Sequence, residues 1–131
     1  MLILTIRTSE PIAEIGLFTD SGEELGYERW EAHRQLADSI HLKIKQLLAK
    51  QQQKLSAIDG IVCFQGPGSF TGLRIGLSVG NGLSYSLHIP IAGAKGKNWV
   101  ASGIKNLLEK PDRQPIIPDY GAPVHITPPR K

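Results

Sequence analysis

A chain of 131 residues with 40% hydrophobic residues, 21% charged residues and a net charge of +3 has the composition of a folded globular domain, not of a disordered chain. No run of about 20 apolar residues occurs, so the sequence offers no membrane-spanning helix. The one cysteine, Cys63, excludes an internal disulfide, and its apolar neighbours indicate a buried structural thiol. We expect a cytoplasmic protein without a secretory signal.

The first third of the chain predicts three strands and a helix. Residues 2–8, 13–19 and 24–31 are strand-like runs separated by the turn signals SEPI and Asp20-Ser21-Gly22, which favours an antiparallel meander. From about residue 33 the hydrophobic period changes to that of a helix. The apolar positions of this helix are Leu36, Ile40, Ile44, Leu47 and Leu48.

Strands and helices alternate in the remainder of the chain. Residues 57–64 read as a strand suited to the middle of a sheet, 69–87 as a helix, 88–93 as a short strand and 99–108 as a helix. The order βββαβαβα predicts an α/β fold with a mixed sheet covered by helices. This is the single ribonuclease-H-like lobe that the actin, sugar-kinase and Hsp70 ATPases also use.

The composition changes after residue 110. Six of the nine prolines lie in residues 111–131, so we expect a lobe over 1–110 and an extended, proline-rich tail over 111–131. Residues 95–131 also hold seven of the fifteen Lys and Arg but only three of the twelve Asp and Glu. A nucleic-acid-binding end and a merely solvated end both fit this modest excess.

The stretch QGPGSFTGLRIG, residues 65–76, resembles a phosphate-binding loop but fails the spacing tests. A Walker A loop needs a lysine after its last glycine, whereas Gly72 is followed by Leu73. The dinucleotide pattern fails as well, because Thr71 stands where the third glycine belongs. Backbone amides at a helix N-terminus could still hold an anion, and that alternative stays open.

Three glycines recur every four residues inside the predicted helix, at Gly72, Gly76 and Gly80. Each glycine costs a helix about 1 kcal/mol relative to alanine, so a close contact should offset the cost. We expect the apolar row that begins at Ile75 to pack on the sheet and the glycine row to admit a second helix. Spacing alone leaves open whether that helix is the first helix of the same chain or belongs to another subunit.

No catalytic constellation is evident. The four histidines show no metal-ligand spacing, and no pair of carboxylates stands where strand ends suggest a cleft. In the actin-like ATPases the turn after the first strand carries an aspartate for metal and phosphate, whereas here the matching residue is Arg7. We therefore expect no catalytic, cofactor-binding or metal-binding residues.

The run from Ala57 to Gly93 closely resembles the TsaB (YeaZ) family. The mark of that family, G-P-G-S-F-T-G-[LV]-R-[IL]-G after a buried strand, fits eleven consecutive positions, 66–76. The opening strand also resembles the family's L-x-I-D-T-S, with Arg7 in place of the aspartate, and residues 122–131 resemble its terminal segment. A second lobe that family members usually have in between is absent. The motif loop comprises Gly66, Pro67, Gly68, Ser69, Phe70, Thr71 and Arg74.

The resemblance implies a subunit that is not a catalyst by itself and has no cofactor. Family members partner the paralogous TsaD, which transfers a threonylcarbamoyl group to tRNA, and the TsaE ATPase joins them, so that tRNA is reached through the complex. The first two helices form the family's dimer surface, which also makes a homodimer possible here. On this reading the predicted interface residues are His33, Leu36, Ile40, Ile44, Gly72, Gly76 and Gly80.

Two alternative functions remain open on the sequence: a degenerate nucleotide-binding domain, and a module that binds tRNA directly through the basic tail. For the tail we expect part of residues 122–128 to dock on the lobe, with a disordered tail as the alternative.

Overall fold

A five-stranded mixed sheet with the order β3-β2-β1-β4-β5 forms the centre of the computed structural model, which describes residues 1–32, 35–68 and 70–119. The strands are β1 (Leu2–Arg7), β2 (Ile12–Thr19), β3 (Glu24–Glu31), β4 (Gly60–Phe64) and β5 (Ile91–Ala94). The first three strands are antiparallel, and β4 pairs in parallel with both β1 and β5. The predicted meander and the order βββαβαβα are confirmed.

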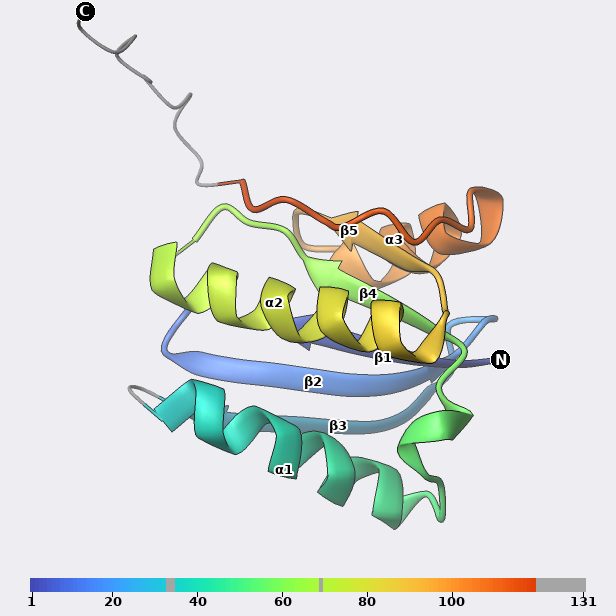
Figure 1. Cartoon of the computed structure of the whole chain (residues 1–131), viewed down its shortest axis with the longest axis horizontal. Coiled ribbons are helices and arrows are strands. Elements are labelled where there is room, and N and C mark those ends of the chain that lie inside the picture. The colour runs from blue at the N-terminus through green and yellow to red at the C-terminus, as the bar shows by residue number, and fades with distance from the viewer. Residues whose placement is uncertain (33–34, 69, 120–131) are drawn as a thin grey trace, which may run out of the picture.

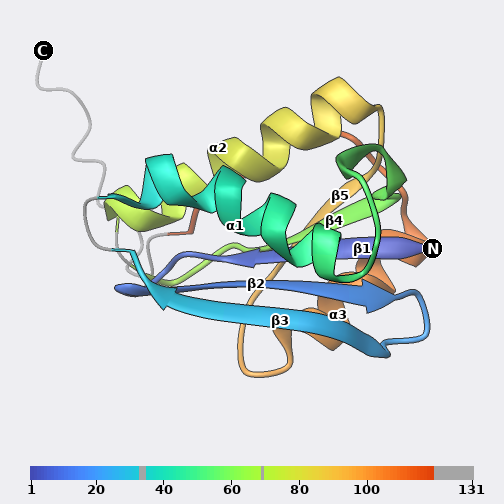
Figure 2. The same cartoon turned by 90° about the horizontal axis from the view of Figure 1, so that it is seen from below.

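Helices cover both faces of the sheet. Helices α1 (Leu36–Lys50) and α2 (Phe70–Leu87) lie on one face and α3 (Trp99–Glu109) lies on the other, as Figures 1 and 2 show. The apolar positions of α1 are buried as its periodicity predicted. Two apolar clusters result, one between the sheet and α1 and α2, and one between the sheet and α3.

Two strands begin later than the sequence suggested. A single 3-10 turn, η2 (Leu55–Ala57), occupies the predicted start of β4. At β5 the delay comes from His88, which has a left-handed backbone (φ +58°) and closes α2, so that the amide of Ile89 donates to the carbonyl of Ser84 at 3.1 Å. This closure uses a left-handed residue directly after the helix, a position usually held by glycine.

Gly76 and Gly80 of the glycine row of α2 pack on the sheet of their own chain, which corrects their predicted contact with a second helix. A Cβ added to Gly76 would overlap the Thr8 side chain, and one added to Gly80 would overlap the Cys63 sulfur. The Thr8 hydroxyl donates to the carbonyl of Gly72 at 2.7 Å. The missing side chains therefore allow the helix backbone to approach β1 and β4 closely.

Two aromatic rings cover the part of the sheet that α3 leaves open. The rings of Phe18 and Tyr27 meet edge to face, 6.3 Å apart, over Gly16, where a Cβ would lie 2.7 Å from either ring. The Tyr27 hydroxyl donates to Glu14 at 2.5 Å. Burial, and then this hydrogen bond to a carboxylate, raise the pKa of Tyr27 above its usual value.

The described part of the predicted tail lies along the lobe. Residues 111–119 are extended and run back along β5 (Figure 1). The division into a lobe over 1–110 and a tail over 111–131 stays a prediction, and the expected docking of residues 122–128 lies outside the described residues. Within the described part of the chain, no helix is long and apolar enough to cross a membrane.

The different surroundings of two glycines on α2 lead to a first prediction. Gly76→Ala should lower the free energy of unfolding by about 1–3 kcal/mol, because its Cβ overpacks Thr8. Gly82→Ala should raise that free energy by up to about 1 kcal/mol, because a Cβ there meets nothing within 4 Å and alanine favours the helix. Urea unfolding of both variants measures the difference, and equal effects would contradict the packing described for α2.

Candidate functional site

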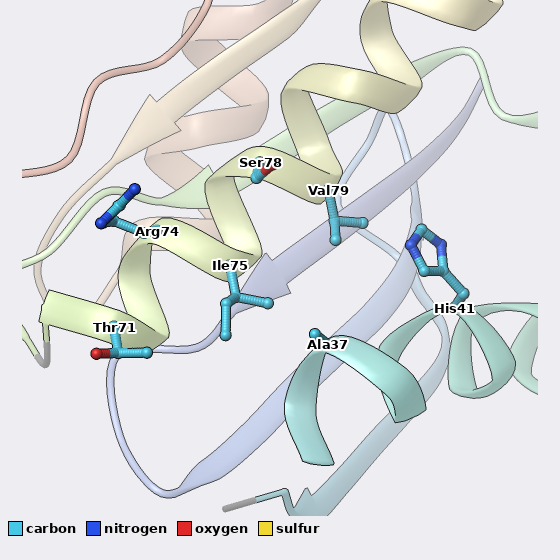
Figure 3. A pocket seen from close by; sticks show the side chains of 7 residues that line it. All are labelled: Ala37, His41, Thr71, Arg74, Ile75, Ser78 and Val79. Carbon is cyan, nitrogen blue, oxygen red and sulfur yellow. The ribbon is translucent and has the colours of Figure 1, made fainter. Parts of the chain in front are cut away.

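A groove of about 460 Å³ separates α1 from α2 on the outer side of the molecule. Figure 3 shows Ile75 and Val79 of α2 pointing toward α1, from which Ala37 and His41 face them. Ile75 and Val79 are half-buried, whereas Thr71, Arg74 and Ser78 at the rim are exposed. An apolar floor with a polar rim is the usual composition of a protein-association surface.

Small residues form the outward ridge of α2 beside this groove. Ser78, Gly82 and Ser86 are exposed and follow one another at intervals of four residues. A Cβ on Gly82 would lie in open space, so no contact within the described chain accounts for a glycine in the middle of this helix. Two large apolar side chains are exposed nearby on the same helices: Tyr85 of α2 (81%) and Leu42 of α1 (57%).

The predicted interface residues lie elsewhere. Leu36, Ile40 and Ile44 are 5%, 0% and 1% exposed and belong to the core under α1. Gly76 and Gly80 face the sheet, which corrects their predicted position at a subunit contact.

Gly72 and His33 complete the predicted set. Gly72 is half-exposed, and its carbonyl accepts the Thr8 hydrogen bond. It also lines a smaller groove of about 230 Å³ with Glu10 and Pro11. His33 lies outside the described residues. Of the described members of the set, Leu36 and Gly72 line this smaller groove together, whereas Ile40, Ile44, Gly76 and Gly80 are buried. The predicted pair of helices does form the outer surface.

The sequence contained a signal for the outward ridge that the predicted set missed. Asn81 and Gly82 are two poor helix formers in succession, and Gly82 lies midway in the small-residue row Ser78, Gly82, Ser86. The row Gly72, Gly76, Gly80 has the same spacing. The interface prediction was based on this row and therefore chose the side of the helix that faces the sheet.

The glycines of the motif loop make contacts within the chain. Gly66 has a left-handed backbone (φ +125°), and a Cβ there would overlap the carbonyl of Asp119. A Cβ on Gly68 would overlap Ser9 in the turn after β1. Among the other motif residues, Pro67, Thr71 and Arg74 are exposed, Ser69 lies outside the described residues, and Phe70 begins α2. The two glycines thus have a steric role that needs no phosphate.

Arg7 occupies the end of β1 as a fixed cation. Its guanidinium carbon lies 4.1 Å from the centroid of the Phe64 ring. Its Nε donates to Ser9 at 3.2 Å, and its Nη2 donates to Glu10 at 3.4 Å. A positive charge held in this way repels a second cation at the same strand end. Among the described residues, no three His, Cys, Asp or Glu side chains are grouped so that they could hold a metal ion.

Cys63 is buried in β4 next to Gly80. Burial raises the pKa of its thiol from the usual 9.0 to about 12, because the charged thiolate is poorly solvated there. The predicted buried structural thiol is confirmed.

For the native protein we therefore expect reaction of Cys63 with a disulfide reagent at pH 8 to be roughly a hundredfold slower, or more, than for the unfolded chain, since the thiolate is the nucleophile. The native state keeps its proton to higher pH than the unfolded state. The contribution of the buried, protonated thiol to the free energy of unfolding is therefore fully present below about pH 9. It falls as the pH rises toward 12, because the unfolded chain then loses the proton first. Equal reaction rates in the native and unfolded protein would contradict the burial of this thiol.

The comparisons with known proteins agree with this architecture. The family model described as "TsaD: tRNA N6-adenosine threonylcarbamoyltransferase" matches residues 30–118. The chain is 28% identical over 103 residues to the tRNA threonylcarbamoyladenosine biosynthesis protein TsaB of Escherichia coli (strain K12), covering 79% of this chain and 44% of that protein. The structure of YeaZ from Pseudomonas aeruginosa has a TM-score of 0.65 at 30% identity, covering 72% of this chain and 43% of that one.

A more distant structure shows the fold alone. Thermus thermophilus RuvC in complex with a Holliday junction substrate has a TM-score of 0.52 at 11% identity, covering 92% of this chain and 85% of that one. The architecture is thus a single ribonuclease-H-like lobe, as predicted. The chain belongs to the TsaD family whose model it matches, and its resemblance to the TsaB (YeaZ) members is confirmed. It spans less than half the length of these TsaB and YeaZ relatives.

Proposed function

We propose that this chain is a non-catalytic partner subunit in tRNA threonylcarbamoyladenosine biosynthesis and that it associates with a TsaD-type threonylcarbamoyltransferase. The names of its relatives support the pathway. The observation that carries the proposed association is Gly82, an exposed helical glycine that no contact within the described chain explains, beside the apolar groove between α1 and α2.

The association surface would consist of the outer faces of α1 and α2. A helix of the partner could approach the ridge Ser78, Gly82, Ser86 closely, because no long side chain rises from it. Burial of Tyr85 and Leu42 by the same partner would supply apolar area, since a tyrosine is a frequent anchor of such interfaces. The same surface would serve a homodimer, so the partner and a second copy would compete for it.

Features of the described residues support a role without chemistry of its own. The cation Arg7 matches the position at which the actin-like ATPases have an aspartate for metal and phosphate. The one cysteine is buried as a neutral thiol. The resemblance further implies the TsaE ATPase as a component of the assembly. We infer that tRNA is contacted through the complex.

A substitution on the ridge tests the proposed surface. Gly82→Leu should weaken association with the TsaD of the same organism about tenfold or more, because its side chain holds the two helices apart. Its melting temperature should stay equal or rise, because leucine favours the helix. Titration calorimetry with the two proteins purified separately measures the dissociation constant. Lys105→Leu places the same side chain on the exposed surface of α3, across the sheet, and is the matched control.

Three outcomes of this experiment are informative. Unchanged affinity of Gly82→Leu would refute the outward ridge as the contact. A loss of affinity shared by Lys105→Leu would indicate a general effect of surface leucine and would also refute it. Loss of affinity confined to Gly82→Leu supports the proposal.

The nucleotide-binding alternative has a separate test. Calorimetry with ATP and magnesium at millimolar concentration should give no saturable heat, since Arg7 opposes the metal and the described residues form a single lobe. Saturable binding at millimolar or lower concentration would favour the alternative. Arg7→Ala serves as the control, because it removes the opposing charge at the end of β1 and so separates the effect of that charge from the effect of having a single lobe.

A further inference from the structure

Residues 112–119, here called the strap, are held along β5 by hydrogen bonds to main-chain groups (Figure 1). Asn81 of α2 forms a reciprocal pair with Ile116: its Nδ2 donates to the carbonyl at 3.0 Å, and its Oδ1 accepts from the amide at 2.8 Å. Gln65, directly after β4, forms a second pair. Its Nε2 donates to the carbonyl of Ile117 at 2.8 Å, and its own carbonyl accepts from the amide of Asp119 at 2.8 Å.

Side chains of the strap add further contacts, among them a hydrogen bond between Arg113 and His88, with 2.9 Å between Nη1 and Nδ1. Ile116 packs against Gly93 of β5, where a Cβ would lie 2.9 Å from its Cγ2 atom. The Asp119 carboxylate lies 2.5 Å from the Nζ of Lys95. We call the surface formed by Gln65, Asn81, Gly93 and Lys95 the α2–β5 groove. It binds an extended backbone together with one apolar and one acidic side chain.

The strap buries little apolar surface against the lobe. Residues 112–115 are exposed, and Ile117 is 73% exposed. Few buried apolar contacts mean that such a segment opens at a lower free energy than the lobe unfolds. Pro115 and Pro118 restrict the backbone in advance, which lowers the entropy lost when the segment docks.

Release of the strap would expose the edge of the sheet. β5 is the terminal strand in the order β3-β2-β1-β4-β5, and its Ile91 amide donates to the carbonyl of Asp112 at 2.7 Å. An open sheet edge beside a groove is a common site for the addition of an extended segment from another molecule.

We propose that the α2–β5 groove is a peptide-docking site and that the strap of a second copy of this chain can occupy it in exchange for the chain's own strap. A second copy brings the same main-chain groups, the same isoleucine and the same aspartate, so docking within and between chains makes identical contacts. Only the effective concentration favours the chain's own strap. The groove lies on the flank of α2 that faces β5, and near the end of the helix Arg113 of the strap borders Tyr85 and Ser86 of the surface assigned to the partner subunit. The exchange does not depend on the proposed function.

Two complementary full-length variants test the exchange. Ile116→Pro with Asp119→Ala gives a chain with a defective strap and an intact groove. Asn81→Ala gives a chain with a defective groove and an intact strap. Hydrogen exchange followed by mass spectrometry, with one chain labelled by ¹⁵N, reports on the strap of the Asn81→Ala chain alone.

The amides of Ile116 and Asp119 in the Asn81→Ala chain should exchange at least about tenfold more slowly when the strap-defective chain is added in excess. Addition of a second Asn81→Ala chain should have no effect. Ser78→Ala, on the exposed side of α2 beside the groove toward α1, should leave strap protection unchanged.

Three results would overturn the proposal. If the strap of the Asn81→Ala chain stays as protected as in the native chain, the contacts described here do not hold it. If that strap is released but the strap-defective chain restores no protection, the groove accepts the strap only within its own chain. Restored protection that also appears with the Asn81→Ala chain as the added partner would reveal association at another surface and would equally overturn it.

Discussion

The close contact between α2 and the centre of the sheet is the constraint on which the other surfaces depend. Gly76 and Gly80 let the helix backbone approach Thr8 and Cys63, and the Thr8 hydroxyl holds the carbonyl of Gly72. With no side chain in between, the helix has little freedom to rotate or to shift along β1 and β4. Every outward position of α2 follows from this contact.

Each remaining side of α2 then has its own neighbour. Ile75 and Val79 form the floor of the groove toward α1, and Gly82 lies on the outward ridge. On the side of β5, Asn81 forms hydrogen bonds with the strap. The helix thus contributes to two surfaces, which adjoin near its end, where Tyr85 and Ser86 lie beside Arg113 of the strap. One glycine-rich helix positions both, so a change in its packing on the sheet would alter the two surfaces together.

Apolar periodicity predicted the fold well, because burial determines it directly. The periods of two and of 3.6 residues identified every strand and α-helix of the described chain, but not the 3-10 turn η2. Their ends were less accurate, since left-handed closure at His88 depends on local backbone geometry. The side of α2 that faces the sheet was predicted wrongly for a different reason. A row of glycines and a row of apolar residues can both pack on a sheet, and the choice depends on small partners such as Thr8, which lie far away in the sequence.

The strap shows a second limit of sequence analysis. Asn81 and Gln65 recognise carbonyls and amides, which every residue has, so the sequence of residues 112–119 carries almost no trace of these contacts. The family motif identified the loop at Gly66 but not its neighbour Asp119. Motif matching locates such a loop, whereas its steric partner becomes visible only in three dimensions.

The position of the strap in the chain has a consequence for biosynthesis. Gln65, Asn81, Gly93 and Lys95 all precede the strap, so the ribosome releases the complete α2–β5 groove before it releases the segment that fills it. Because domains begin to fold from the N-terminal side during synthesis, the lobe can form while the edge of β5 is still open. Nascent chains on neighbouring ribosomes of one messenger RNA would then present open grooves to one another, and docking of the strap is the step that ends this exposure.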